Sequence, residues 1–198
     1  MKRCLDIAGA FVGLVVLAPL LIAVWIFVVL ESGLPGLFCQ QRIGRGGRDF
    51  VLYKFRTMTV RRGTESGSFD AGSSTRVTRV GRILRKTKLD ELPQLWNVLK
   101  GDMSLVGPRP EVRKWVEAYP ARWAKVLTVR PGITDPASIV YRNEEEILAE
   151  STDPEATYRE EILPHKLSLY EEYVDTRSFR GDIGILLKTL RVMMKSET

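Results

Sequence analysis

Two adjacent carboxylates, Asp90 and Glu91, are the residues of this sequence whose type and spacing most clearly suggest chemistry. They follow residues 76–88, which contain six Lys or Arg and no acidic residue. Adjacent carboxylates can hold Mg²⁺ or attack phosphorus, and a cationic neighbourhood attracts phosphate groups. The pair therefore suggests phosphoryl chemistry, although it also has a purely structural interpretation.

The structural interpretation is that Asp90 and Glu91 cap a helix. Apolar residues recur at helical spacing from Leu92 to Leu99, and Pro93 would fall in the first turn, where proline is tolerated. Acidic side chains at a helix N-terminus most often only cap the helix and offset its dipole, which is worth about 0.5–2 kcal/mol. The free N–H groups of the same helix end can, however, also attract phosphate.

Arg109 favours the chemical interpretation of the carboxylate pair. It lies between Pro108 and Pro110 in the segment GDMSLVGPRP, and the two prolines restrict the backbone around it. A guanidinium group presents a planar fork that matches the oxygens of phosphate. The combination with Asp90 and Glu91 predicts a site for a phosphorylated ligand.

Composition and charge limit the class of protein and of ligand. With 198 residues and 44% hydrophobic content, the chain can bury the core of one domain. The formal charge of +6 and the pI near 9.4 imply an anionic partner, either nucleic acid, an anionic membrane surface or a phosphorylated substrate. With one His and two Cys, any metal is expected to be a hard cation with oxygen ligands, which means Mg²⁺, with Mn²⁺ as a substitute.

Residues 7–30 are expected to lie in a membrane, because they form an uncharged apolar run of 24 residues. Pro19, which follows Ala18, lacks an N–H group and should kink or break a helix there. Basic residues flank the run on both sides, so both ends are expected to be cytoplasmic. We therefore expect a re-entrant helix broken at Pro19; a single spanning anchor and a cleaved signal peptide remain alternatives.

The rest of the chain predicts a mixed α/β fold that is mainly helical. Residues 49–58 alternate as a strand that carries Lys54, and residues 76–88 form a basic helix with Val77, Val80, Ile83 and Leu84 on its buried side. The polar segment 61–75 is expected to be a connecting loop, or else a substrate lid. Two amphipathic segments, 111–127 with Trp115 and Trp123 and the C-terminal 183–195, are expected to meet the membrane surface. An ordinary amphipathic surface helix is the alternative for the first, and packing on the core is the alternative for the second.

Three motifs give the chain a family resemblance. The segments LYKFRTM, LDELPQLWNVLKGDMSLVGPRP and RPGIT follow the proline-containing hydrophobic N-terminus, and together they resemble the bacterial sugar transferases, the small monotopic phosphoglycosyl transferases. The resemblance implies transfer of a sugar 1-phosphate from a nucleoside diphosphate sugar, usually a UDP-sugar, to polyprenyl phosphate, with release of UMP. It also implies a re-entrant membrane helix in residues 1–32 and a catalytic domain in 33–198, on the cytoplasmic face of the bacterial inner membrane.

The resemblance also implies a role for individual residues. It makes Asp90 the nucleophile, with a covalent sugar-phosphate intermediate, and it makes Glu91 a ligand of Mg²⁺, with Asp90 beside it. It further suggests substrate-binding residues on the strand, on the basic helix, in GPRP, in YRN and near the C-terminus: Lys54, Arg85, Arg109, Arg142 and Asp182.

The sequence departs from the family pattern at two places. Many relatives have Ser where Ala18 precedes the membrane proline, which affects the expected depth and angle of the bend. Asp135 and Pro136 stand where relatives often have a Gly-Trp-Ala-Gln run, which we interpret as the mark of a subgroup with a different sugar preference. The sequence predicts neither the sugar nor the oligomeric state.

Two functions other than sugar-phosphate transfer are also compatible with parts of the sequence. A membrane-tethered nucleic-acid-binding regulator would explain the basic charge, but we recognise no nucleic-acid-binding motif in the sequence, so no nucleic-acid partner is expected. A non-catalytic membrane scaffold would explain the hydrophobic segment but not the residues gathered around Asp90.

Overall fold

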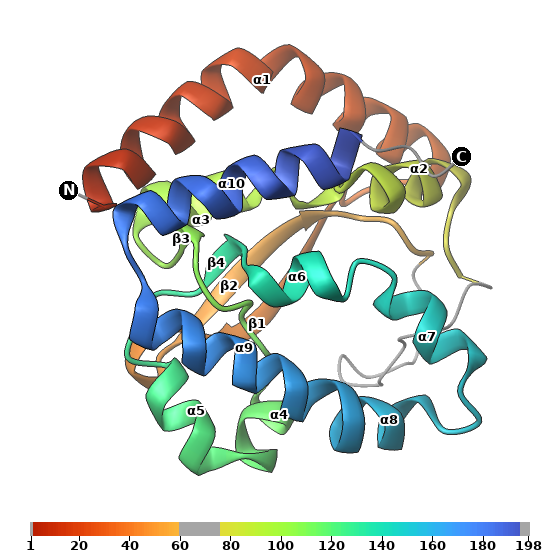
Figure 1. The fold of residues 1–198 in the computed structure, drawn as a ribbon. Coiled ribbons are helices and arrows are strands. Elements are labelled where there is room, and N and C mark those ends of the chain that lie inside the picture. Colours follow the sequence, from red (N-terminus) through yellow and green to blue (C-terminus); the bar gives the residue numbers. More distant parts are fainter. Residues whose placement is uncertain (1, 60–75, 195–198) are drawn as a thin grey trace.

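The computed structural model describes residues 2–59 and 76–194 of the chain and is mainly helical (Figure 1). The loop predicted at 61–75 lies outside the described residues. The helices are α1 (Lys2–Ser32), α2 (Arg79–Thr87), α3 (Gln94–Lys100), α4 (Arg113–Ala118), α5 (Pro120–Val126), α6 (Pro136–Val140), α7 (Glu144–Glu150), α8 (Pro154–Thr157), α9 (Leu163–Thr176) and α10 (Phe179–Met194). The strands are β1 (Leu37–Ile43), β2 (Asp49–Phe55), β3 (Ser104–Val106) and β4 (Gly132–Thr134), and three short helical turns are η1 (Arg45–Gly47), η2 (Leu89–Glu91) and η3 (Tyr158–Ile162).

Helix α1 forms an arch over one side of the molecule (Figure 1). It is long and apolar enough to cross a membrane. Only 11% of the residues in its most apolar stretch are buried, and Phe11, Val16 and Leu30 are among its many exposed side chains. The predicted break at Pro19 does not occur, because α1 continues as one helix on both sides of the proline. The helix as a whole is curved (Figure 1). A single missing N–H group can be tolerated at a bend without ending the helix.

Both ends of α1 are attached to the rest of the described chain. At the start, Arg3 donates from Nη1 to the carbonyl of Val98 at 2.7 Å, and Asp6 accepts from the Ser104 hydroxyl at 2.9 Å. At the end, Arg56 donates from Nη2 to the carbonyl of Ser32 at 2.6 Å. The arch is therefore fixed to one body at both of its ends.

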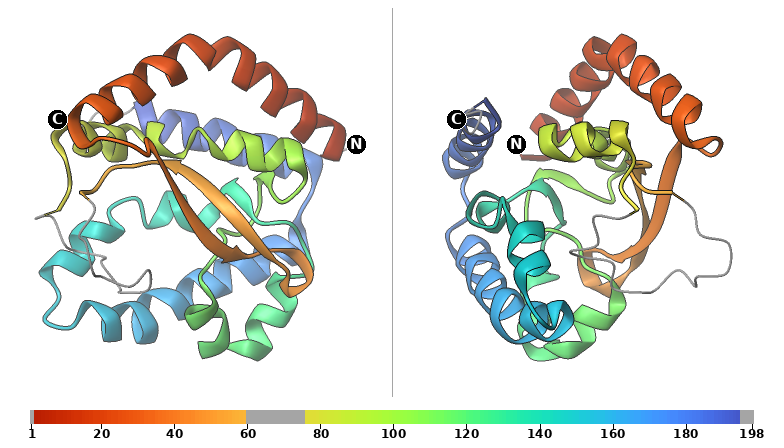
Figure 2. Two further views of the ribbon diagram at one scale, coloured as in Figure 1. Left: turned by 180° about the vertical axis from the view of Figure 1, so that it is seen from behind. Right: turned by 90° about the vertical axis from the view of Figure 1, so that its right-hand side faces the viewer.

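The strand predicted around Lys54 is confirmed as β2. It pairs antiparallel with β1, which the sequence analysis did not predict, in a register that sets Phe38 opposite Lys54 and Arg42 opposite Phe50. Because successive side chains alternate between faces, Lys54 and Arg42 lie on the same face of this hairpin. Seen from behind, the hairpin crosses the molecule diagonally, from the end of α1 toward α5 (Figure 2). The short strands β3 and β4 form a separate parallel pair.

The two tryptophans predicted to lie at the membrane surface are instead part of the core. Trp115 of α4 is 4% exposed and Trp123 of α5 is 1% exposed, and they pack with Leu163, Leu167 and other residues of α9. In Figure 1, α4 and α5 lie at the opposite end of the molecule from α1. The interfacial prediction for residues 111–127 is therefore wrong, because burial against α9 accounts for the aromatic side chains.

The basic helix is confirmed as α2, but only part of the prediction of which of its side chains are buried is correct. Leu84 is buried, whereas Ile83 is 63% exposed. On α10, which contacts α6, β3 and β4, Phe179, Leu187 and Leu190 are exposed as well. These apolar side chains face outward and do not pack on the core.

Candidate active site

The two carboxylates do not cap a helix. Lys88 ends α2 with a left-handed backbone (φ 57°), and the chain then makes the 3₁₀ turn η2, which contains Asp90 and Glu91. Helix α3 starts only after Pro93, and no side chain caps its N-terminus. The capping interpretation is therefore wrong: the left-handed residue and the tight turn direct both acids inward, where Asp90 is 7% and Glu91 8% exposed.

Glu91 is held by two cations from distant parts of the chain. Lys54 Nζ of β2 lies 3.1 Å from Oε1 of Glu91. Arg109 makes a two-pronged contact, with Nη1 3.1 Å from Oε2 and Nη2 2.5 Å from Oε1. Such a bidentate pair fixes both the position and the plane of the carboxylate. The structure thus brings together three of the predicted site residues.

The ionisation of Glu91 follows from these contacts. Burial alone would raise the pKa of Glu91, but the charges of Arg109 and Lys54 outweigh it and hold that pKa well below its ordinary value. Burial lowers the pKa of Lys54, with Glu91 opposing the change. Glu91 is consequently a carboxylate whose charge is balanced within the protein.

Asp90 is in the opposite situation. Its Oδ1 is buried and accepts no hydrogen bond from any described residue. Burial, followed by the charge of Glu91, raises the pKa of Asp90 to about 6. A buried polar atom without a partner is costly, so it suggests a ligand that supplies the partner. One turn along, Gln94 is 1% exposed and its amide Nε2 also has no partner, a feature that the sequence analysis missed.

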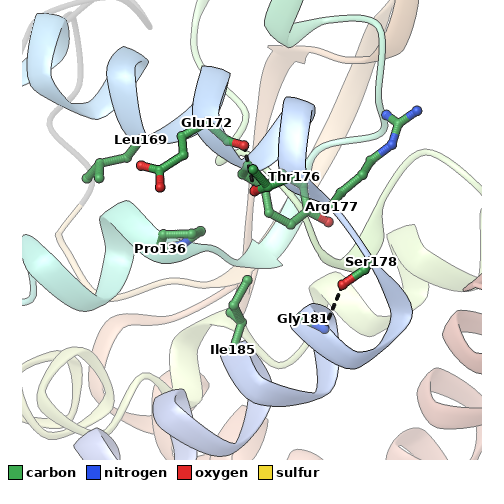
Figure 3. Close-up of a pocket in the computed structure, with 9 residues that line it drawn as sticks. Pro136, Leu169, Glu172, Thr176, Arg177, Ser178, Gly181 and Ile185 are labelled. Carbon is green, nitrogen blue, oxygen red and sulfur yellow. Dashed lines mark hydrogen bonds between the residues drawn. The ribbon is translucent and has the colours of Figure 1, made fainter.

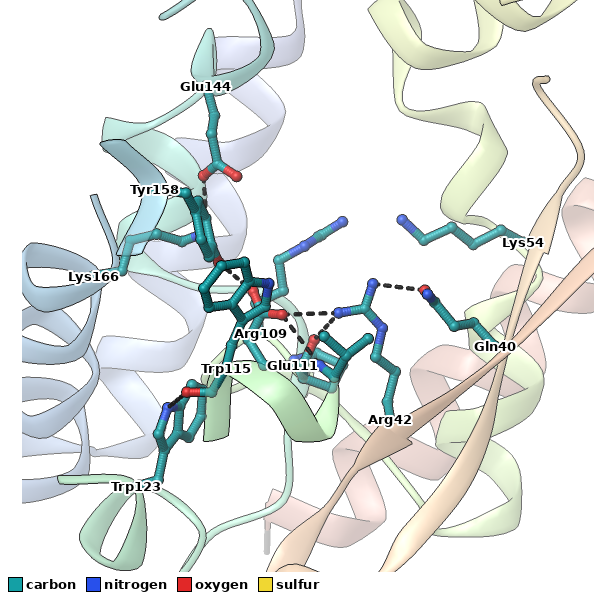
Figure 4. A network of polar contacts seen from close by, with 12 residues as sticks. Gln40, Arg42, Lys54, Arg109, Glu111, Trp115, Trp123, Glu144, Tyr158 and Lys166 are labelled. Atoms are coloured by element: carbon teal, nitrogen blue, oxygen red, sulfur yellow. Dashed lines mark hydrogen bonds and ion pairs between the residues drawn. The ribbon is translucent and has the colours of Figure 1, made fainter. Parts of the chain in front are cut away.

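A second group of buried charges lies beside Arg109 and was also missed. Glu111 accepts from Arg42 Nη1 at 3.0 Å and from the Tyr158 hydroxyl, and the charge of Lys166 acts on it as well. Figure 4 shows the side chains of Arg42, Lys54 and Arg109 pointing toward a common space from β1, β2 and the segment before α4. The signal in the sequence was Glu111 directly after GPRP, since a buried arginine needs acids nearby.

The other predicted substrate-binding residues have different surroundings. Arg85 pairs with Glu145 of α7 at 3.3 Å, which joins α2 to the segment that follows Arg142. Arg142 itself is half-buried between α6 and α7. The structure shows no ion pair between either arginine and Asp90 or Glu91 in the residues it describes.

Asp182 is bonded to the start of α1. It pairs with Lys2 Nζ at 2.6 Å and accepts from the Tyr173 hydroxyl at 2.8 Å. Tyr173 lines a hollow of about 150 Å³ where α9 leads into α10, near Pro136 and Ile185 (Figure 3). Both carboxylate oxygens of Asp182 therefore have structural partners, and its assignment to substrate binding stays a prediction.

The donor set is compatible with the expected Mg²⁺. No group of three or more His, Cys, Asp or Glu that could enclose a metal occurs in the described part of the chain. Two adjacent carboxylates suit a hard cation that takes its remaining ligands from water and substrate phosphate, as Mg²⁺ usually does. The unpartnered Oδ1 of Asp90 fits such a ligand, and Oε2 of Glu91, which accepts from Arg109 Nη1, keeps a second lone pair.

The comparisons with known proteins agree with these motifs. The family model described as Bacterial sugar transferase matches residues 1–196. The chain is 37% identical, over 99% of its length, to the UDP-glucose:undecaprenyl-phosphate glucose-1-phosphate transferase of Caulobacter vibrioides, and it covers 70% of that protein. It is 39% identical, over its whole length, to the uncharacterized sugar transferase EpsL of Bacillus subtilis, of which it covers 89%.

Other relatives are considerably longer than this chain. It is 36% identical, over 98% of its length, to the UDP-N-acetylgalactosamine-undecaprenyl-phosphate N-acetylgalactosaminephosphotransferase of Aeromonas hydrophila, but it spans only 44% of that protein. On the family match and these identities, the chain belongs to the bacterial sugar transferase family.

Proposed function

We propose that this protein transfers a sugar 1-phosphate from a UDP-sugar to undecaprenyl phosphate and releases UMP. The relatives' names supply the reaction class. The observation in this chain that carries the proposal is the contrast between the two carboxylates. Glu91 is neutralised by Arg109 and Lys54, while the buried Oδ1 of Asp90 has no partner and is available to react.

In the first step, an ionised Asp90 oxygen attacks the phosphorus that carries the sugar. A bond forms between this oxygen and phosphorus, and the bond from phosphorus to the oxygen that bridges the diphosphate breaks. UMP leaves with that oxygen and its electron pair, and the sugar phosphate remains on Asp90 as an acyl phosphate. Burial favours this attack, because a carboxylate without hydrogen bonds need not shed them before reacting.

In the second step, a phosphate oxygen of the polyprenyl acceptor attacks the same phosphorus. The bond from phosphorus to Asp90 breaks, the carboxylate is restored and polyprenyl diphosphate-sugar is formed. Lys54 and Arg109, which lie against Glu91, offset the negative charge that gathers around the phosphorus in both steps. Mg²⁺, held by Glu91 and Asp90 together with the diphosphate, would supply further charge neutralisation.

We also propose that α1 enters and leaves the bilayer on the cytoplasmic side. Arg3 at its start and Ser32 at its end are both bonded to the same body, which a helix spanning the membrane could not achieve unless that body lay on both sides. The curvature of α1, which contains Pro19, supports this topology (Figure 1), as do the exposed apolar side chains along the arch.

Replacement of the nucleophile tests the reaction. Given the correct UDP-sugar and Mg²⁺ but no acceptor, the wild type should release UMP up to about one equivalent per site, and it should exchange labelled UMP into UDP-sugar. Asp90→Asn should do neither. The matched control is Asp153→Asn, a change at the exposed cap of α8, which should do both. Normal turnover by Asp90→Asn, or exchange that strictly requires the acceptor, would mean direct transfer between the two bound substrates.

The two cysteines test the topology. Cys4 near the start of α1 and Cys39 in β1 are both exposed in the structure. In intact cells both should resist an impermeant thiol reagent, and both should react in inside-out vesicles. Labelling of Cys4 from outside the cell would establish a spanning helix instead.

A further inference from the structure

The end of the membrane helix holds two catalytic elements at once. Near the C-terminus of α1, Glu31 accepts hydrogen bonds from the backbone N–H groups of Arg79 at 2.8 Å and Val80 at 3.0 Å. These are the first two residues of α2. Thr78 is the N-cap of α2, with its hydroxyl accepting from the Gly81 N–H at 2.9 Å, and Glu31 is a second acceptor that bonds the two remaining N–H groups of the first turn and ties the start of the helix to α1.

Helix α2 leads directly to the reactive carboxylates. It has nine residues, so it is about 13 Å long, and Lys88 connects it to η2 without any intervening loop. Gly81 packs closely against the backbone of Thr57, since a Cβ atom on it would lie 2.2 Å from the Thr57 carbonyl oxygen. Because no loop separates α2 from η2, a change in how the start of α2 is held reaches Asp90.

The same end of α1 also holds the strand that carries Lys54. Arg56, two residues beyond Lys54, is 5% exposed, and it donates to the hydroxyl and carbonyl of Ser32 at 2.9 and 2.6 Å. The Lys54–Glu91 ion pair then joins this strand to η2. The contacts form a closed ring that runs from α1 through α2 to Glu91, and back through Lys54 and Arg56 to α1.

We propose that Glu31 is a positioning residue of the site, which through α2 fixes the position of Asp90 relative to Lys54. The way in which the membrane helix packs against α2 would then control the rate of the first chemical step. This inference rests on the proposed function. Glu31 touches none of the reacting groups in the described structure, so its effect should fall on the rate of the step and not on donor binding.

Glu31→Gln tests the proposal without threatening the fold, because Glu31 is exposed. The amide can still accept one of the two hydrogen bonds but lacks the charge. Removal of a helix cap corresponds to a change of about fivefold in an equilibrium or rate constant. We expect the rate constant of the UMP burst to fall by about this factor, with unchanged burst amplitude and unchanged KM for the UDP-sugar. Glu31→Asp, which keeps the charge, should recover part of the rate.

The readouts separate positioning from mere destabilisation. A loss of folded protein would lower the burst amplitude and leave the rate constant unchanged, which would overturn the proposal. Asp153→Asn, which alters a cap on a helix unconnected with Asp90, should change neither quantity.

Hydrogen exchange tests the coupling without any substrate. Amides of residues 88–92 should exchange about fivefold faster in Glu31→Gln than in wild type, and at the wild-type rate in Asp153→Asn. Unchanged exchange there would refute the coupling, even if the enzyme is active. A wild type that releases no UMP would refute the proposed reaction, and the exchange result would still decide whether Glu31 positions Asp90.

Discussion

The buried state of Asp90 predicts that its removal stabilises the protein. Burial and the charge of Glu91 raise the pKa of Asp90 from 3.8 to about 6. At about 1.36 kcal/mol for each pKa unit, ionising Asp90 in the folded protein costs about 3 kcal/mol at neutral pH. Asn carries no charge, although its buried amide keeps part of the desolvation cost. Asp90→Asn should therefore raise the free energy of unfolding by about 1–3 kcal/mol at pH 7.5.

The sign of the pH dependence is fixed by the raised pKa. Below pH 3.8, Asp90 is protonated both in the folded and in the unfolded chain, so it costs nothing. Between pH 3.8 and about 6 the unfolded chain ionises first, and the wild type loses stability as the pH rises. Above about 6 the penalty is constant. The difference in unfolding free energy between Asp90→Asn and the wild type should therefore grow between pH 3.8 and about 6 and stay constant at higher pH.

Thermal unfolding of the purified protein in one detergent, at several pH values, measures this difference. For a chain of this size 1 kcal/mol corresponds to about 2–4 °C, so the variant should melt roughly 2–12 °C higher at pH 7.5. Asp153→Asn is the control, since Asp153 is an exposed helix cap. If Asp90→Asn melts below the wild type at neutral pH, by an amount that does not vary with pH, Asp90 acts as a structural cap and the reasoning fails.

Three further predictions concern activity. Because attack requires ionised Asp90, the rate constant of UMP release should fall about tenfold from pH 7 to pH 5, as the pKa of about 6 is crossed; a flat profile would contradict this. Arg109→Lys cannot form the two-pronged contact with Glu91 and should lower kcat/KM about a hundredfold, whereas Arg113→Lys, at an exposed pair with Asp49, should leave it unchanged. Activity should be lost in EDTA and restored by Mg²⁺ or Mn²⁺, and full turnover in the chelator would exclude the metal assignment.

Local patterns predicted the elements of the fold that depend on local sequence. The apolar run predicted α1, the alternation around Lys54 predicted β2, and the spacing of apolar residues predicted α2 and, apart from its start, α3. The start of α3 was misplaced because Lys88 adopts a left-handed backbone, which nothing in TKLDELPQL signals. That one residue turns two predicted helix caps into buried site residues.

Contacts between distant segments were beyond prediction from local patterns. The motif match identified Lys54 and Arg109 one at a time, but their meeting at Glu91 depends on how β2 packs on η2. Trp115 has basic residues beside it in the sequence, as aromatic residues at a membrane surface often do. Its packing against α9 and Tyr158 is what makes it part of the core. The assignment of Asp182 depended on a looser match, and its partners Lys2 and Tyr173 come from opposite ends of the chain.

The order of the two acids explains how neighbouring carboxylates can have different tasks. Glu91 has one more methylene than Asp90, and from η2 it reaches both the amine of Lys54 and the fork of Arg109. Asp90, one residue earlier on a tight turn, faces the same buried space without either bond. Because the cations are already taken by Glu91, they cannot lower the pKa of Asp90 enough to offset its burial. This difference supports the proposal that Glu91 organises the site and that Asp90 is the carboxylate that reacts.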